Sequence, residues 1–201
     1  GDNDLDIVGV CQTSSENGPG FFRVRNGPNG FLEQNIGLQL NGLSESEYPV
    51  NVQMADMDGD GDNDALISMN DTISYLENDS SGIFQRGYQF NDNARRIVDF
   101  KLADFDQDGY EDVITLTSID AKLWLNRFQE NGVVTFEYFE DLVISGSSSI
   151  LNVITADFNN DSYPDFLLPS VLFDEIYFNR LFDNSITSGF NSVIGLQNDR
   201  I

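Results

Sequence analysis

The sequence has no histidine and a single cysteine. The lack of histidine removes the commonest general base and the commonest transition-metal ligand of proteins, so zinc and copper are poor candidates for a metal site. A single cysteine cannot form an intrachain disulfide. The chain is therefore neither a disulfide-stapled scaffold nor a typical zinc protein.

Basic residues are scarce: 10 Lys and Arg stand against 34 Asp and Glu, which gives a formal net charge of −24. Nucleic acids and anionic lipids are held mainly through Lys and Arg contacts to phosphate, so this composition excludes nucleic-acid binding. Carboxylates packed close together destabilise a folded chain by mutual repulsion. They must be spread over the solvated surface or neutralised in clusters by a cation, and their arrangement favours the cation.

Long apolar runs are also missing. No stretch approaches the roughly 20 apolar residues that cross a bilayer, so membrane insertion is not expected. A sustained 3.6-residue periodicity is lacking too, which predicts few or no helices. Apolar residues nevertheless make up 40% of the chain, with 16 Phe among them. The chain can therefore fill a core and is expected to fold.

An internal repeat organises the sequence. Residues 55–64, 103–112 and 156–165 align without gaps as Asp-rich segments, each followed by an apolar run, and residues 1–6 match the second half of the same motif. The last Asp of each segment falls at position 6, 64, 112 or 165. A unit of roughly 50 residues thus recurs four times, which is the length of one four-stranded propeller blade.

Strand signals support this interpretation. Val134, Phe136 and Tyr138 alternate with polar residues, the period expected of half-buried strands. The dipeptides Asn29-Gly30 and Asn131-Gly132 predict hairpin turns, because both positions of such a turn need positive φ. The predicted fold is all-β: a β-propeller region with four blades of four antiparallel strands each.

The Asp-rich loops carry the pattern of a calcium site. Counted from the first Asp, acidic or amide side chains occupy positions 1, 3, 5 and 9, position 7 can offer its backbone carbonyl, and the last Asp can supply two oxygens. Such a cage of six or seven oxygens suits calcium better than magnesium, which demands a stricter octahedron. The predicted ligands are Asp56, Asp58, Asp60, Asp62 and Asp64 in one loop, Asp104, Asp106, Asp108, Tyr110 and Asp112 in the next, and Asp157, Asn159, Asp161, Tyr163 and Asp165 in the last.

Two other interpretations of the loops are an ordinary solvated turn and an EF-hand. A single Asp- and Gly-rich segment could be an ordinary solvated turn, but recurrence at one place in a repeat argues against this. An EF-hand loop needs Glu at position 12 and flanking helices. Here position 12 is Ile67, Thr115 or Leu168, and both flanks have strand character, so the EF-hand is excluded.

The loops are not expected to bind equally well. Asn159 replaces one carboxylate in the last loop, and Ser162 stands where the other loops have Gly. The partial loop at the start of the sequence offers Asp2, Asp4 and Asp6 at positions 5, 7 and 9. Binding should therefore be weaker in the last loop, and the partial loop forms an incomplete cage by itself.

With their Ala-Asp lead-in and Asp-aliphatic exit, these loops resemble the FG-GAP/VCBS-type repeats of integrin α chains and of secreted bacterial proteins. The resemblance covers essentially the whole chain and implies a β-propeller with one calcium ion in the loop that joins the first two strands of each blade. The name-giving Phe-Gly…Gly-Ala-Pro segment is absent, so the chain is more similar to the bacterial versions. The family implies an extracellular or cell-surface setting, where calcium is abundant enough to fill weak sites.

The 201 residues are expected to form a single propeller region that belongs to a longer chain. The sequence starts inside an Asp loop, and its end aligns with a segment that precedes such a loop. Closed propellers usually have four to eight blades, and a ring of about seven is favoured. A four-bladed ring and a ring closed by a second copy are the two alternatives.

Fold alone does not fix function. The leading hypothesis is a non-catalytic extracellular binding or adhesion module, stabilised by calcium, whose protein or glycan partner docks on a propeller face. The alternatives are the propeller of a secreted polysaccharide lyase or hydrolase, in which paired Asp residues act as acid and base, and a purely architectural scaffold. Trp124, which lies between two leucines, is expected to pack in the core rather than to stack on a sugar.

Overall fold

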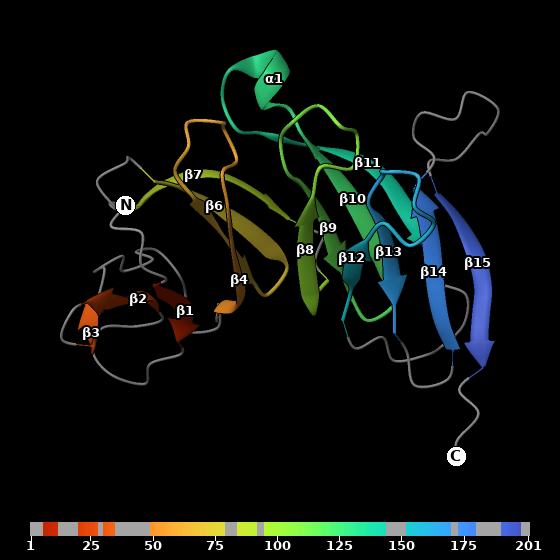
Figure 1. The fold of residues 1–201 in the computed structure, drawn as a ribbon, viewed down its shortest axis with the longest axis horizontal. Helices are drawn as coiled ribbons and strands as arrows, with labels where there is room; N and C mark the ends of the chain where they lie inside the picture. The colour runs from red at the N-terminus through yellow and green to blue at the C-terminus, as the bar shows by residue number, and fades with distance from the viewer. Residues whose placement is uncertain are drawn as a thin grey trace.

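The structure is a computed structural model, and the ranges it describes are 6–11, 20–27, 30–34, 49–78, 84–91, 95–143, 152–169, 173–179 and 190–197. Within them the chain forms four antiparallel sheets that follow one another in sequence order (Figure 1). The first sheet contains β1 (Ile7–Cys11), β2 (Gly20–Gly27) and β3 (Gly30–Gln34). The second contains β4 (Pro49–Ala55), β5 (Asp64–Met69), β6 (Thr72–Asn78) and β7 (Phe84–Asn91).

The other two sheets repeat the second. The third contains β8 (Asp99–Ala103), β9 (Asp112–Leu116), β10 (Asp120–Asn126) and β11 (Phe136–Val143). The fourth contains β12 (Ile154–Ala156), β13 (Asp165–Leu168), β14 (Phe173–Asn179) and β15 (Phe190–Gln197). Each strand pairs with the next one along the chain, so every sheet is a simple meander. Three sheets thus have the four strands expected, whereas the described part of the first sheet has three, because β1 directly follows the partial Asp loop.

The middle strands of the second and third sheets are the most deeply buried. All residues of β5 and of β9 are buried, whereas β7 buries only Phe84 and Phe90. The first strands of successive sheets lie next to one another, β4 beside β8 and β8 beside β12. Asn51 of β4 donates to the Asp99 carboxylate of β8 at 2.7 Å. The sheets therefore radiate from a shared inner edge, as blades do in a β-propeller.

The apolar core consists of three clusters, each between two consecutive sheets. The clusters join the first sheet to the second, the second to the third and the third to the fourth, with pairs such as Phe21 and Ile67, Ile73 and Val113, and Leu123 and Phe166. Burial of apolar area on both faces of a sheet is what stabilises one blade against the next. The continuous apolar runs after each Asp loop supply these faces.

The second residue of each Asp loop adds to this packing. Met57 and Phe105 are fully buried and belong to the clusters that join their own sheet to the following one. The equivalent Phe158 is 40% exposed. Among the described residues no fifth sheet covers the fourth, which accounts for the exposure of Phe158.

The two expected hairpin turns have different outcomes. Gly27 of β2 pairs with Gly30 of β3, which confirms the first hairpin. Gly30 has φ 94° as predicted but is the first residue of β3, and Asn29 lies outside the described residues. The Asn131-Gly132 turn was predicted wrongly. It ends a one-turn helix, α1 (Phe128–Asn131), whose last turn is closed by the Gly132 N–H donating to the Phe128 carbonyl at 2.7 Å.

The prediction of few or no helices agrees with this architecture, since α1 is the only helix that the described residues form. No helix in the described part of the chain has the length and apolarity to cross a membrane.

Candidate metal-binding loops

The three complete Asp loops occupy equivalent places in the sheets. They join β4 to β5, β8 to β9 and β12 to β13, and we call them loop A (residues 56–64), loop B (residues 104–112) and loop C (residues 157–165). All three lie at the same end of the blades (Figure 1). The repeat seen in the sequence therefore places three sets of acidic side chains along one edge of the molecule.

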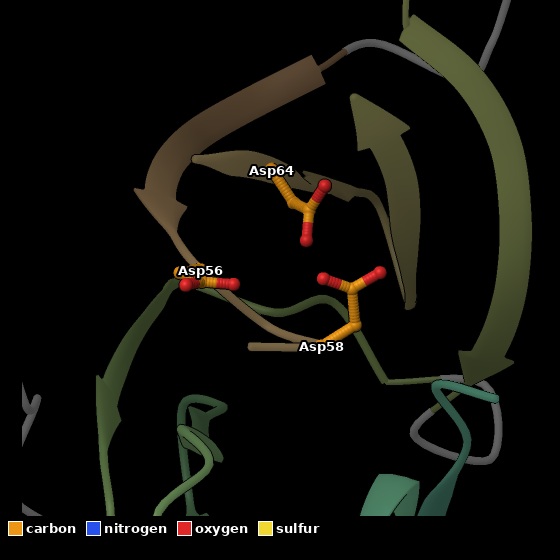
Figure 2. A group of neighbouring side chains, drawn as sticks. All are labelled: Asp56, Asp58 and Asp64. Carbon is orange, nitrogen blue, oxygen red and sulfur yellow. The ribbon is translucent and has the colours of Figure 1, made fainter. Parts of the chain in front are cut away.

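In loop A the side chains of Asp56, Asp58 and Asp64 converge. Each offers a carboxylate oxygen, and these oxygens lie within 4.8 Å of one another. Figure 2 shows the carboxylates of Asp58 and Asp64 facing each other across the space that Asp56 enters from the side. Asp60, predicted as a ligand at position 5, is exposed and does not join this group.

Backbone hydrogen bonds fold loop A around its first residue. The Asp56 carboxylate accepts N–H bonds from Gly59 at 2.7 Å and from Gly61 at 3.0 Å. Gly61 has φ 93°, a conformation that side-chain-bearing residues rarely adopt. Asp62, expected to act through its backbone carbonyl, donates its N–H to Asp60 at 2.9 Å. The turn residues thus curl loop A around the Asp56 carboxylate.

Loop B brings together Asp104, Asp106 and Asp108, again with carboxylate oxygens within 4.8 Å of one another. The Asp104 carboxylate accepts N–H bonds from Asp108 and Gly109, each at 3.0 Å. One oxygen of Asp108, Oδ2, is buried and has no hydrogen-bond partner. An unpaired carboxylate oxygen at the centre of an acidic group is the feature that a bound cation would satisfy.

Loop C is built differently. Asp157 accepts N–H bonds from Asp161 at 3.1 Å and from Ser162 at 2.9 Å, as in the other loops. The Asn159 amide, however, donates to Asp161 Oδ2 at 2.8 Å and so occupies an oxygen predicted to bind metal. Ser162 has φ 76°, where loops A and B have Gly. Among the described residues only loops A and B gather three acidic oxygens, so loop C is the poorest of the three sites.

The last Asp of each loop is a buried structural acceptor. In loop B, Asp112 is fully buried, its Oδ2 accepts the N–H of Phe105 at 2.8 Å, and its Oδ1 accepts the N–H of Asn126 at 2.8 Å. The same two bonds recur at Asp64 and Asp165. This carboxylate therefore ties the start of its loop to the end of the third strand of its own blade.

The partial loop keeps part of this pattern. Asp6 Oδ1 accepts the N–H of Asn26 at 2.9 Å, which is the equivalent of the Asn126 bond in loop B. Asp2 and Asp4 lie outside the described residues.

The FG-GAP-like repeat model matches residues 56–115 and 104–168, which together make up more than half of the chain. The chain belongs to the FG-GAP-like repeat family. The two matches begin at the first Asp of loops A and B, so the repeats recognised in the sequence are those of the structure. No curated protein matches the chain in sequence.

A solved β-propeller structure shares the fold of this FG-GAP-like chain. BBS1N, solved in complex with ARL6DN, aligns with a TM-score of 0.50 and 8% identity over 95% of this chain and 56% of that one. The Nup170 N-terminal domain of Chaetomium thermophilum, solved with Nup53, aligns with a TM-score of 0.44 and 9% identity over 72% of this chain and 21% of that one. The chain thus spans about half and about a fifth of these neighbours, and such low identities concern the fold alone.

The FG-GAP-like loops concentrate negative charge in partly buried places. Burial, followed by the charge of neighbouring loop carboxylates, raises the pKa of Asp58 and of Asp106 above the usual range. Burial also raises the pKa of Asp64 to about 6 and of Asp112 to about 8, against the hydrogen bonds that their carboxylates accept. Without a counter-ion, the ionised loops are therefore costly for the fold.

Loop B has a fixed cation beside it. Arg127 lies at the end of β10, with its Nη1 3.5 Å from Asp106 Oδ2 and its Nε 2.8 Å from Glu137 Oε2. The guanidinium holds the pKa of Asp106 down, although less strongly than burial raises it. Arg127 therefore offsets part of the charge of loop B, a role that the sequence analysis did not identify.

Two tyrosines were predicted to act through their backbone carbonyls at position 7. The Tyr110 ring packs against Phe128 with centroids 5.1 Å apart, and a side chain on Gly59 of loop A would meet it at 3.1 Å. Tyr110 therefore packs across to the neighbouring loop. Tyr163 of loop C is half-buried.

The sequence analysis did not identify a set of asparagines that link the blades. Asn126 donates through Nδ2 to the Met57 carbonyl of loop A at 2.9 Å, and Asn179 donates to the Phe105 carbonyl of loop B at 2.8 Å. Both are buried, and each lies 14 residues after the last Asp of its own loop. This constant spacing could have identified the asparagines from the sequence. The sequence does not show, however, which carbonyl group of the neighbouring blade each one would bind.

Proposed function

We propose that loops A and B bind calcium and that the bound ions stabilise the propeller. The observation that carries this proposal is the pair of three-carboxylate groups at equivalent places, each with its oxygens within 4.8 Å. The buried and unpaired Asp108 Oδ2 supports it, because a buried carboxylate oxygen without a partner is costly. A bound cation would neutralise each group and satisfy that oxygen.

Calcium suits this donor set better than other metals. The side chains available in loops A and B are carboxylates, which are hard oxygen donors, and the chain has no histidine. Calcium accepts irregular shells of six to eight oxygens, whereas magnesium needs a near-ideal octahedron. In loop A, Asp56, Asp58 and Asp64 would hold the ion, and in loop B, Asp104, Asp106 and Asp108 would hold it. Loop C is expected to bind more weakly.

We further propose that the chain is a non-catalytic binding module that works outside the cell or on its surface. Loops of this type bind usefully where calcium is near millimolar, as it is in extracellular fluids. The loop carboxylates serve as hydrogen-bond acceptors for their own backbone, which leaves a structural role for them and no evident acid–base pair. The partner would be a protein or a glycan, and the remaining blades would come from the same longer chain or from a second copy.

Thermal unfolding with calcium titrated against a chelator tests the calcium proposal. A site filled at about 100 times its Kd stabilises by about 2.7 kcal/mol, and each kcal/mol shifts the Tm of a chain of this size by roughly 2–4 °C. We therefore expect calcium to raise the Tm by about 5–10 °C per strong site, with magnesium much less effective.

Matched variants identify the loops as the source of that shift. The double variant Asp58→Asn/Asp108→Asn should lose most of the calcium-dependent rise. Glu77→Gln removes one negative charge at an exposed position outside the loops and should keep the rise. An unchanged Tm in the wild-type protein, or an equal rise in the double variant, would refute the proposal.

A further inference from the structure

A cleft lies between the second and third blades, away from the Asp loops. It has a volume of about 640 Å³ and is lined by Tyr88, Gln89, Phe90, Asn91, Lys122, Trp124 and Tyr138. Asn91 pairs with Thr72, and Thr72 pairs with Met69 at the end of β5, whereas loop A enters β5 at Asp64. On the third blade, Trp124 pairs with Val113, which directly follows Asp112 of loop B. The cleft therefore runs along the strands between the two blades, and none of its lining residues belongs to an Asp loop.

Aromatic rings form the wall of this cleft. Tyr88 and Tyr138 are 38% and 46% exposed, whereas Phe90 and Trp124 beneath them are almost fully buried. Tyr88 stacks on Phe90 with centroids 6.5 Å apart, Phe90 contacts Trp124 at 4.7 Å, and Trp124 meets Tyr138 edge-on at 5.6 Å. The two exposed tyrosines are thus held in place by a buried aromatic layer. Trp124 packs in the core, as predicted, and also reaches the cleft.

Polar side chains complete the lining. Gln89 and Asn91 are exposed amides on β7, and the Gln89 amide donates to the Ser74 hydroxyl. Lys122 on β10 is nearly buried and also lines the cleft. Ligand sites in proteins combine apolar and aromatic surface with a few placed polar groups in this way.

Blade packing does not require Tyr138. Trp124 of β10 pairs with Tyr138 of β11, but in the fourth blade the corresponding Tyr177 pairs across β14 and β15 with Ser192. The Trp124–Tyr138 pair is therefore specific to the third blade and is not repeated in the fourth.

A β-bulge places Tyr88. Ser74 pairs with Gln89 and Leu76 pairs with Arg86, so Gly87 and Tyr88 together oppose one residue of β6. A Cβ atom on Gly87 would come within 2.5 Å of the Tyr75 ring. Bulges of this kind redirect a side chain and often lie at binding sites. Here the bulge carries Tyr88 to the cleft.

We propose that this cleft binds a neutral saccharide, an inference that names a partner class and a site for the proposed binding role. The apolar face of a sugar ring packs on exposed tyrosines, and its hydroxyls exchange hydrogen bonds with amides and an amine. A formal net charge of −24 opposes polyanionic ligands. Lys122 within the cleft opposes cationic ones, so an uncharged, hydroxyl-rich ligand fits best.

The single tryptophan of the sequence makes the test direct. Trp124 lines the cleft, so its fluorescence reports occupancy there and nowhere else in the chain. The probes are neutral oligosaccharides of xylose, glucose, mannose, galactose and N-acetylglucosamine, titrated in calcium into the wild-type protein. We expect a saturable change in Trp124 emission with at least one series.

Variants separate the cleft from other aromatic surface. Tyr138→Ser installs the residue found at the equivalent place in the fourth blade and should weaken binding about tenfold, as should Tyr88→Ala. Phe139→Ala is the matched control, because Phe139 is 43% exposed on the same strand but does not line the cleft. Its affinity should equal that of the wild type.

The outcomes distinguish this inference from the calcium proposal. No saturable change with any series would overturn the saccharide inference, even where calcium raises the Tm and the calcium proposal stands. Equal weakening by Phe139→Ala and Tyr138→Ser would overturn it too. A peptide that alters Trp124 emission when no saccharide does would identify a protein-binding cleft instead.

Discussion

At the scale of single residues, the loop carboxylates divide into two kinds. Asp112 is buried and accepts N–H bonds from Phe105 and Asn126, so it acts as an internal acceptor. Asp108 accepts one N–H from Tyr110 through Oδ1 and leaves Oδ2 without a partner. Residue type alone does not separate these roles, because both residues are Asp in the same loop. Their positions in the motif do, since the last Asp of each complete loop is the internal acceptor.

The two kinds of carboxylate should respond differently to mutation. Asp112→Ala leaves buried N–H groups without acceptors and should cost about 2–4 kcal/mol of unfolding free energy, with or without calcium. Asp108→Asn keeps the acceptor for Tyr110 and removes a repulsive charge, so in chelator it should be neutral or slightly stabilising. Urea unfolding in chelator and in calcium measures both. A loss for Asp108→Asn in chelator as large as that for Asp112→Ala would contradict the division.

The raised pKa values of Asp64 and Asp112, about 6 and about 8, predict a pH dependence in the absence of metal. The folded state holds these protons more tightly than the unfolded state, whose carboxyl pKa is near 3.8. Stability is therefore greatest near the unfolded value and is lost as the pH rises through the folded values.

In chelator, the Tm should fall by at least ~5 °C between pH 5 and pH 8.5, since each kcal/mol corresponds to roughly 2–4 °C. Calcium competes with protons for the loops, so saturating calcium should reduce or reverse this trend. Asp112→Asn should flatten the profile in chelator, and Glu77→Gln should not. A Tm that rises with pH in chelator would show that burial does not control these carboxylates.

At the scale of elements, the blade is the unit that repeats and the asparagine at the end of its third strand connects it to its neighbour. Asn126 and Asn179 each reach the carbonyl of a buried loop residue in the preceding blade. Asn78 occupies the same place in the second blade but donates to Asn63 of its own blade, at 3.1 Å. The same residue type therefore supports either an interblade or an intrablade bond.

Removing the interblade bond should cost more than removing the intrablade one. Asn179→Ala leaves the buried Phe105 carbonyl without a donor and should lower the unfolding free energy by about 1–3 kcal/mol. Asn78→Ala affects an exposed bond and should cost less than about 1 kcal/mol. Chemical denaturation ranks the two variants. Equal losses would mean that these asparagines do not hold the blades together.

At the scale of the whole molecule, the predictable features were those that the repeat carries. The period of the Asp loops and the apolar runs after them predicted the blades, because each run is a strand covered on both faces. Asn131-Gly132 was misread as a hairpin turn because Gly in a left-handed conformation also ends helices. The cleft of Tyr88 and Tyr138 could not be predicted, since it depends on a bulge and on contacts between two blades.

The Asp loops lie at one end of the blades, whereas the aromatic cleft is lined by strand residues between two blades, none of which belongs to an Asp loop. This separation allows metal binding to set stability while a partner binds elsewhere on the same scaffold. The Asp loops and the cleft can therefore be altered independently, and each proposal has variants that leave the other site intact.

A crystal structure of the protein grown in millimolar calcium, with anomalous scattering used to locate the ions, tests the central claim most directly. The account predicts an ion in loops A and B, at about 2.3–2.6 Å from side-chain oxygens of Asp58 and Asp108, with lower occupancy in loop C. Loops A and B without an anomalous peak, and with Asp108 Oδ2 still unpaired, would contradict it.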